Sequence, residues 1–221
     1  MSVTPGSLIT IFGSNLASST ASADTIPLST KLGGVNVQIN GIDAPLTFVT
    51  GGQVNAQLPW EVQAGTAQVL VTRDGTTSPP QTFQVAPFSP GIFTADGAHA
   101  IVINLDGTLA LAAGAIPGLT THPAKAGDTV IIYATGLGAV DSSIVTGTNS
   151  VDKLRSTSTV PTVLVGGVAV TPAFSGLTPQ FVGVNQLNIV IPGNAPTGNS
   201  VSLQLSVGGL TTSNSVTMAI Q

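Results

Sequence analysis

Short runs of apolar and β-branched residues alternate with polar residues along the whole chain, and turn residues separate the runs. In residues 35–39 the alternation is strict, and the run ends at Asn40-Gly41, a dipeptide typical of tight hairpins. No window of about 11 residues has the apolar stripe of an amphipathic helix. The pattern predicts an all-β protein, built as a sandwich or barrel. The other runs lie at 7–12, 67–72, 101–104, 129–133, 163–165, 168–170, 187–191, 201–207 and 216–220.

An internal repeat divides the chain into two similar units. Three pairs of matching blocks follow one another in the same order, at offsets of 121, 133 and 133 positions. The pairs are 5–12 with 126–133, 32–37 with 165–170, and 53–59 with 186–192. The change of offset predicts about 12 extra residues in the second copy, which we place within 140–159.

Each repeat has the size of an Ig-like sandwich. We therefore predict two tandem Ig-like β-sandwich units, residues 1–87 and 126–221. A connector that contains one hairpin, residues 88–125, is expected to join them.

The low charge defines the expected setting. Only 6% of the residues are charged, the net charge is −4, cysteine is absent and 42% of the residues are hydrophobic. Five basic residues leave no electrostatic footprint for nucleic acid, and no apolar run is long enough for membrane insertion. A surface covered by Ser, Thr, Asn and Gln is commoner in exported bacterial modules. We expect an extracellular or cell-surface location, as a fragment of a longer exported protein.

Two resemblances follow from longer motifs. Residues 5–16 (PGSLITIFGSNL) resemble the first strand and turn of IPT/TIG domains, an Ig-like β-sandwich family. Almost the whole chain resembles the C-terminal domain of large secreted proteins from Solibacter-type Acidobacteria. This second resemblance implies a place at the end of an exported protein, and it implies no activity, cofactor or catalytic residue. Its motifs are VNAQLPWE at 54–61, SPGIF at 89–93, NLDGTL at 104–109 and YATGLG at 133–138.

The chain has two histidines, His99 and His122, and both fall in the connector. With Asp96 and Asp128 nearby in sequence, they are the candidates for an acid–base or metal site. Their spacing matches no metal motif, and no G-x-S-x-G segment supplies a nucleophile. Asp96 and Asp106 are candidate calcium ligands, although Asp beside Gly is typical of turns. We expect no cofactor, with calcium as the alternative.

Trp60 is the only tryptophan and has no counterpart in the second unit. It is a candidate sugar-stacking platform, with Asn55 and Gln57 as hydrogen-bonding neighbours. The alternative is that Trp60 packs against the Phe88–Phe93 segment. Asn55 and Asn188 share one repeat position, and we expect both to be buried amides that satisfy backbone groups.

We therefore predict a non-catalytic extracellular module for interaction, adhesion or scaffolding, rather than an enzyme. Its expected partners are other extracellular proteins or polysaccharide, or a second copy joined through strand edges that lack protective lysines. One alternative is a carbohydrate-binding module that uses Trp60. The other is a hydrolase with a histidine-containing site in the connector.

Overall fold

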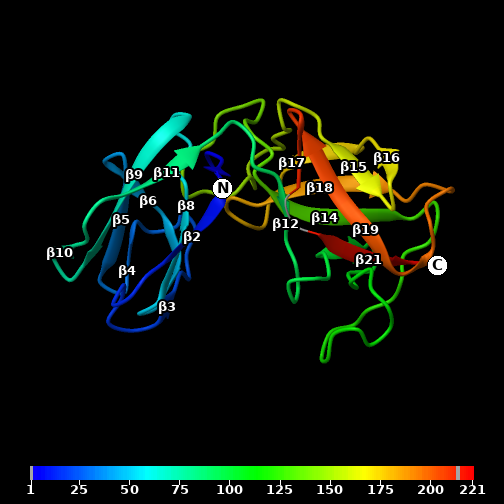
Figure 1. The fold of residues 1–221 in the computed structure, drawn as a ribbon, viewed down its shortest axis with the longest axis horizontal. Helices are drawn as coiled ribbons and strands as arrows, with labels where there is room; N and C mark the ends of the chain where they lie inside the picture. Colours follow the sequence, from blue (N-terminus) through cyan, green and yellow to red (C-terminus); the bar gives the residue numbers. More distant parts are fainter. Residues whose placement is uncertain (1, 213–214) are drawn as a thin grey trace. The chain divides into compact units, whose positions relative to one another are not determined.

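Burial alternates along the strands, as the hydrophobic pattern requires for sheets with one face in a core. In β5 (Val35–Ile39) and β14 (Thr129–Thr135), every second side chain is buried and those between are part-exposed. This computed structural model describes residues 2–212 and 215–221, and these residues form strands, bridges and turns but no helix. The prediction of an all-β chain with tandem Ig-like sandwiches is confirmed (Figure 1).

The first sandwich has a larger and a smaller sheet. The larger sheet is β1 (Ser2–Val3), β11 (Gln81–Val85), β9 (Gly65–Arg73), β5 and β4 (Lys31–Leu32), with β10 (Thr76–Thr77) beside β9 and β6 (Ile42–Ala44) beside β5. The smaller sheet is β2 (Leu8–Phe12), β8 (Gln53–Gln57), β7 (Leu46–Val49) and β3 (Ala21–Ser22). All neighbours are antiparallel except β1, which runs parallel to β11.

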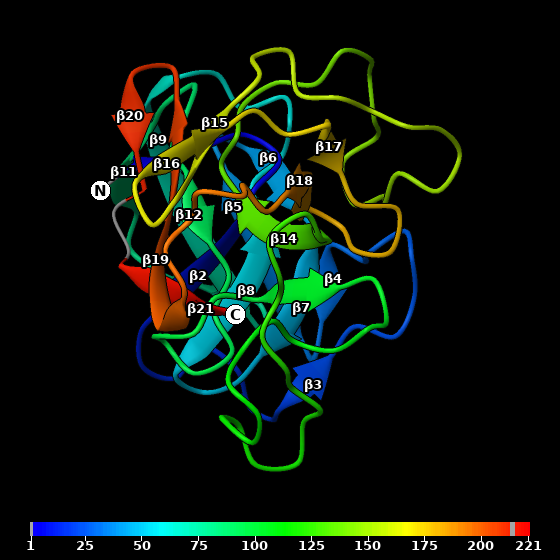
Figure 2. The same cartoon turned by 90° about the vertical axis from the view of Figure 1, so that its right-hand side faces the viewer.

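The second sandwich repeats this plan, and β19 and β21 run side by side in both views (Figures 1 and 2). One sheet is β12 (Gly91–Ile92), β14, β18 (Asn185–Val190) and β17 (Phe174–Leu177), with β13 (Val102–Asn104) beside β14. The other is β16 (Val168–Val170), β15 (Thr162–Val165), β19 (Gly198–Val207) and β20 (Leu210–Thr211), with β21 (Val216–Ile220) beside β19.

The core of the first unit lies between its two sheets. Val35, Val37 and Ile39 of β5 face Val54 and Ala56 of β8, and all five side chains are fully buried. Burying a Val or Ile side chain stabilises the fold by about 1.5–3 kcal/mol relative to leaving it in water. Uncharged packing of this kind holds the sandwich together.

The contacts within the chain define two compact units whose bounds differ from the predicted sequence boundaries. The first unit is Met1–Ser89 with Gly138–Arg155 and Leu177–Val184, and the remaining residues from Pro90 to Gln221 form the second. Residues 90–137 group with the second unit because β12 and β13 pair with β14. Segments 138–155 and 177–184 group with the first unit because they contact residues distant in sequence. For example, Gly147 is hydrogen-bonded to Gln57 and Leu28.

The strand pairing corrects part of the repeat alignment. β9 and β19 are matching strands, because each leads into a two-residue turn, Asp74-Gly75 and Gly208-Gly209, at an offset of 134 positions that places Leu205 opposite Val71 in the alignment. Val37 pairs with Val71, and Val163 pairs with Leu205. Val163 therefore stands in the place of Val37. The offset in this region is 126 positions, and the predicted match of 32–37 with 165–170 is wrong.

The turns explain this error. Gly166-Gly167 occupies the place of the Asn40-Gly41 turn, not that of Gly33-Gly34. All three dipeptides have positive φ at both residues, as a type I′ hairpin turn requires. Gly and Asn adopt this conformation most readily, so the three turns look alike in the sequence.

The extra residues of the second repeat lie in two separate parts of the sequence. Thr10 pairs with Asn55 and Ile131 with Asn188, which gives offsets of 121 and 133 for these strands. With an offset of 126 between them, five extra residues lie in loop 136–161 and seven lie between β16 and β18. The single insertion predicted at 140–159 therefore accounts only for the five residues of loop 136–161.

We predict that Gly6→Ala destabilises the protein more than Gly41→Ala. Both glycines have φ near +80°, so each substitution costs about 1–2 kcal/mol of backbone strain. A Cβ at Gly6 would also overlap the Trp60 ring, whereas a Cβ at Gly41 meets nothing, and this overlap adds about 1–3 kcal/mol. Urea unfolding measures both variants, and equal losses would contradict the packing of Trp60 on Gly6.

Candidate functional site

His122 is held on both sides of its imidazole ring. Its Nε2 lies 2.8 Å from Asp106 Oδ2, and its Nδ1 lies 2.9 Å from the carbonyl oxygen of Pro123. Asp106 Oδ1 accepts hydrogen bonds from the hydroxyl and the backbone N–H of Thr108. Since both principal partners of the ring are acceptors, both nitrogens donate, and the imidazolium form suits the site.

The electrostatics agree with this geometry. The hydrogen bond that His122 donates to Asp106, followed by the one it donates to the Pro123 carbonyl, raises the pKa of His122 above 6.5. The Thr108 hydroxyl and then the imidazole hold the pKa of Asp106 well below its usual range. An imidazole whose two nitrogens both donate has no lone pair to accept a proton, so His122 is not placed to act as a general base.

His99 forms a separate pair with Asp96 in the loop between β12 and β13. Its Nδ1 lies 2.7 Å from Asp96 Oδ2, while Asp96 Oδ1 accepts the backbone N–H groups of Ala98 and His99. The backbone N–H of His99 and then its imidazole lower the pKa of Asp96 to about 2. These bonds close a turn on the carboxylate, which is the local role of many Asp side chains.

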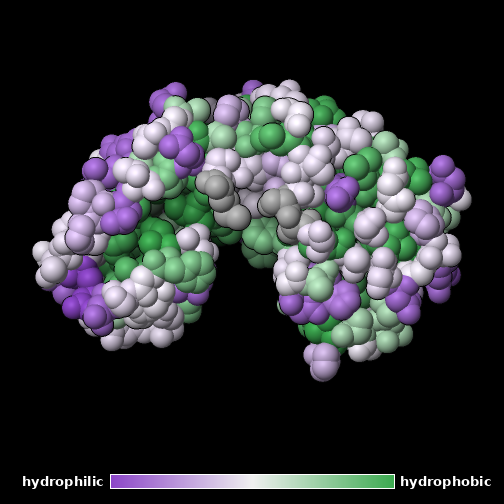
Figure 3. Space-filling model, in the orientation of Figure 1, coloured by the Kyte–Doolittle hydropathy of each residue, from purple (hydrophilic) through white to green (hydrophobic). Residues whose placement is uncertain are grey.

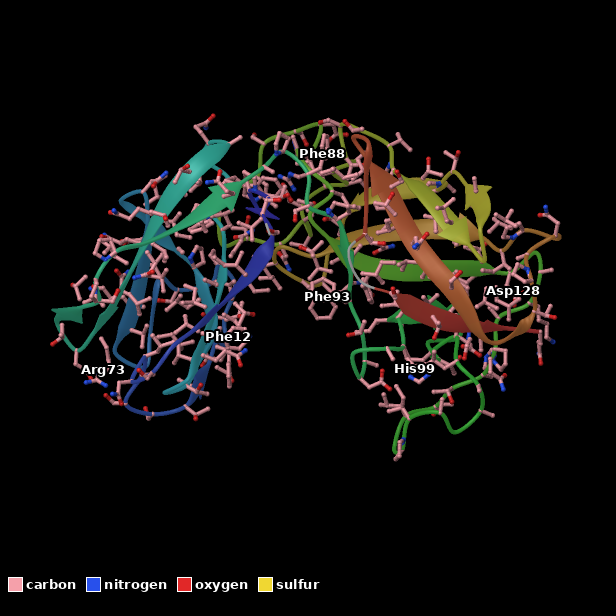
Figure 4. All side chains as sticks on the ribbon, viewed as in Figure 1. Phe12, Arg73, Phe88, Phe93, His99 and Asp128 are labelled. Carbon is pink, nitrogen blue, oxygen red and sulfur yellow. The ribbon has the colours of Figure 1, made fainter. Side chains whose placement is uncertain are left out.

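Asp128 joins neither histidine pair. Its Oδ2 accepts the backbone N–H of Lys125 in the turn before β14, and Figure 4 shows it apart from His99. Sequence reasoning paired Asp128 with a histidine and missed Asp106 as the partner of His122. The bridge between Leu109 and Thr121 brings Asp106 and His122 together, and no sequence motif marks that bridge.

The described residues hold neither a nucleophile aligned with a histidine nor a metal cluster. No serine or threonine hydroxyl among them is hydrogen-bonded to either imidazole. They also include no group of three or more His, Asp or Glu side chains that could hold a metal ion. Asp96 and Asp106 already use both carboxylate oxygens, so calcium binding there stays a prediction.

The residues named for sugar binding are held in the packing of the first unit. Gln57 is 1% exposed, its Nε2 donates to the Gly6 carbonyl, and its Oε1 accepts the Gly147 N–H at 2.7 Å. The Trp60 ring packs on Gly6, and its Nε1 is buried with no hydrogen-bond partner among the described residues. Neither side chain offers an open polar group to a ligand.

Asn55 and Asn188 have the same arrangement in the two units. Both are half-buried, and each accepts a hydrogen bond from the Gln two residues earlier, Gln53 at 2.7 Å and Gln186 at 2.9 Å. The amides therefore bond each other along the strand face, whereas we expected buried amides bonded to backbone. Contact between Trp60 and the 88–93 segment stays a prediction.

A cavity of the first unit lies beside loop 143–155, and we call it the loop groove. It measures about 670 Å³. Its apolar lining includes Ile26, Ile144, Val145 and Val151, and its polar lining includes Arg155. Val145 and Val151 are 72% and 75% exposed, which is unusual for side chains of this kind.

Arg155 anchors the loop that forms this groove. Its guanidinium donates to both carboxylate oxygens of Asp152, at 2.6 and 3.0 Å, to the Ser143 carbonyl, and to the hydroxyl of the buried Ser150. The hydrogen bond from Arg155 lowers the pKa of Asp152 to about 2. The same bond raises the pKa of Arg155. Arg155 is 5% exposed, and its charge is neutralised by Asp152 at the floor of the groove. The rim of the groove is apolar. Sequence reasoning recorded these charges only as part of an insertion.

The comparison with protein-family models matches the N-terminal part of the chain. Residues 1–85 match the model of the IPT/TIG domain. No curated protein matches the chain. Among the residues that the structure describes, none belongs to a helix of the length and hydrophobicity needed to cross a membrane.

Several solved structures are similar to this chain at low sequence identity. One is the SGBP-B protein of the Bacteroides ovatus mixed-linkage glucan utilization locus, in complex with a mixed-linkage heptasaccharide, at 14% identity and a TM-score of 0.38. The match covers 99% of this chain but only 44% of that protein. Another is domains 5–6 of the S-layer protein SbsC, at 14% identity, a TM-score of 0.30, and coverage of 100% and 92%. These likenesses concern the fold alone.

We predict that the His122–Asp106 pair stabilises the second unit most between pH 3.8 and 6.5, the ordinary pKa values of the two groups. The contribution of His122 is full below pH 6.5 and disappears as pH rises through its raised folded pKa. That of Asp106 is full above pH 3.8 and disappears as pH falls.

Urea unfolding of the wild type and His122→Gln at about pH 5 and about pH 9 measures this effect. The difference should be larger at the lower pH, and Asp106→Asn should lower the pKa of His122 in an NMR titration. A pH-independent difference would contradict the pairing.

We predict that Arg155→Lys loosens the loop groove without unfolding the sandwich. Lysine cannot bond Asp152 with two parallel donors while also reaching Ser143. Amide hydrogen exchange should accelerate across 143–155 and stay unchanged in β5. Lys153→Met, which removes an exposed charge from the same loop, is the control and should leave both regions unchanged.

Proposed function

We propose that this chain is a non-catalytic interaction module of an exported or cell-surface protein, and that it binds its partner through the loop groove of the IPT/TIG-like unit. One observation carries the proposal. Exposed large apolar side chains, Val145 and Val151, rim a cavity that buried polar contacts hold in shape. Exposed apolar surface rimmed by polar residues marks interaction sites in soluble proteins.

The chemistry of the groove favours a partner that is recognised by shape and apolar contact. Arg155 is neutralised by Asp152 at the base, and Lys153 at the rim is the other basic group in the lining. Leu154, next to this lining, is 72% exposed and extends the apolar surface. An extracellular protein with an uncharged apolar segment is therefore the proposed partner.

The extracellular setting rests on composition and resemblance. A surface with 6% charged residues suits an exported module. The motif resemblance to the C-terminal domain of secreted Solibacter-type proteins supports the same setting. The position of the two histidines, each tied to a carboxylate in a turn, gives no support to the hydrolase alternative.

We predict that Val151→Asp weakens binding to the envelope fraction of the source cells. A carboxylate on the groove rim would have to be desolvated on docking, and an unpaired carboxylate is costly to bury. Affinity should fall by about tenfold or more in a solid-phase assay with the purified chain. Leu105→Asp, at a site 72% exposed in the second unit, is the matched control and should bind as the wild type does.

Two results would contradict the proposed function. One is the absence of saturable binding by the wild type, or equal loss in Val151→Asp and Leu105→Asp. The other is turnover of generic ester, lactone or glycoside substrates that disappears in His99→Ala or His122→Ala.

A further inference from the structure

β2 forms one edge of the smaller sheet in the first unit. The Leu58 N–H donates to the Ser7 carbonyl and the Gly13 N–H donates to the Gly52 carbonyl, so odd-numbered residues of this segment bond β8. In an antiparallel ladder the alternate residues point the other way. The backbone groups of Leu8, Thr10 and Phe12 therefore face outward, and no described residue pairs with them.

An apolar groove runs along this edge. A cavity of about 260 Å³ lies between β2 and β11, lined by Ile9, Ile11, Val69 and Phe83 among others. Figure 3 shows green apolar surface between these strands of the first unit. The four side chains pack against the core and are only partly buried, so the core is open on this flank.

The path of the chain explains the opening. β1 covers β11 only at Gln84 and Val85. The chain then turns at Thr4–Ser7, where the Ser7 hydroxyl and N–H donate to the Thr4 carbonyl, and crosses to the smaller sheet as β2. Gln81–Phe83 and β2 are left as two facing edges with no strand between them.

The second unit has the same flank, and there it is filled. β14 is the counterpart of β2, and β12 and β13 pair with its outer edge. Tyr133, the counterpart of Phe12, donates its N–H to Ile101 and accepts the N–H of Phe93. The backbone groups that are unpaired in β2 are therefore paired in β14.

The side chains of this covering segment fill the space between the sheets of the second unit. Ala100, Val102, Ala110 and Leu111 are fully buried. β21 is the counterpart of β11, and its edge is also paired, because Thr217 exchanges backbone hydrogen bonds with Ala98 and Ala100. The second sandwich thus shows which kind of segment fits between the edges of β14 and β21. It is an extended segment with small or β-branched apolar residues at alternate positions.

The β2 edge also lacks the features that block strand addition. Its sequence, Leu-Ile-Thr-Ile-Phe, has no charge, no proline and no bulge. At five residues it is longer than the other described edge strands of the first unit that pair with a single neighbour, since β6 has three residues and β1, β3, β4 and β10 have two each. Phe12 is 76% exposed at its end and lies on β2 in Figure 4.

We propose that the β2 edge accepts an antiparallel β-strand from another protein, an uncharged extended segment with small or β-branched apolar residues at every second position. The strand pairs with the backbone of Leu8, Thr10 and Phe12, and its inward side chains fill the groove against Phe83. A second copy joined β2 to β2 would leave this groove empty, because the inward side chains of each β2 already pack in their own core. The proposal concerns a different surface from the loop groove and stands independently of it.

The test uses the full chain and a fluorescein-labelled peptide with the sequence of residues 100–105, flanked by lysines for solubility. This sequence covers β14 in the second unit, and Ile103 there pairs with Ile131, the counterpart of Thr10. Fluorescence anisotropy should show saturable binding. The same peptide N-methylated at the positions of Ile101 and Ile103 should bind about tenfold more weakly or worse, because it cannot form the ladder.

The variants locate the binding on β2. Thr10→Pro removes an outward N–H that β8 does not use, and should weaken binding by about tenfold or more. Thr82→Lys, an exposed position that lines the groove, introduces a charge and provides a second variant if Thr10→Pro does not fold. Thr10→Ala keeps the N–H and should bind as the wild type does. Val151→Asp should also bind normally, which separates this site from the loop groove.

Three results would overturn the proposal. The wild type could fail to bind the peptide, the N-methylated peptide could bind equally well, or both Thr10→Pro and Thr82→Lys could bind as tightly as Thr10→Ala. Sedimentation analysis tests whether a second copy of the chain occupies the β2 edge. A wild-type dimer that Thr10→Pro converts to monomer would assign the edge to a second copy instead.

Discussion

Closure of the flank between two sheets is the constraint on which the organisation of this chain depends. A sandwich whose first strand changes sheets leaves two edges and an apolar opening, and buried polar backbone must find partners. The second unit meets this requirement with residues 90–124, which pair with β14 and β21 and bury side chains such as Val102 and Leu111. These residues are therefore part of a sandwich, although a linear view of the sequence makes them a connector.

Scarcity of charge gives the few charged groups a local role. Each histidine is tied to a nearby carboxylate, and Arg155 bonds Asp152 with two parallel donors. These three pairs hold turns or loops whose surrounding residues are largely polar and exposed. Exposed ion pairs contribute little to stability in general, so their effect is to select one loop conformation.

Local signals predicted the parts of the fold that depend on local physics. Strict alternation predicted β5, and the Asn40-Gly41 turn predicted its hairpin. The Gln-x-Asn motif correctly identified β8 and β18 as equivalent strands of the repeat. The misplaced part of the alignment came from turns that share one backbone conformation. The candidate site was less predictable, because the Asp106–His122 contact depends on a bridge between residues far apart in sequence.

Contacts between residues distant in sequence also explain why loops 138–155 and 177–184 belong to the first unit. Gly147 lies in a loop of the second repeat, yet its N–H donates to Gln57 and its carbonyl accepts the N–H of Leu28. The Gln57 side chain is buried and both its polar atoms are used, so without this loop a buried carbonyl oxygen would lose its partner, which costs about 1–3 kcal/mol. The first sandwich therefore has its interior completed by residues that the repeat assigns to the second. The two units are similar in strand plan and differ in which segment closes them: β12 and β13 cover the outer edge of β14, whereas no described strand pairs with the outer edge of β2.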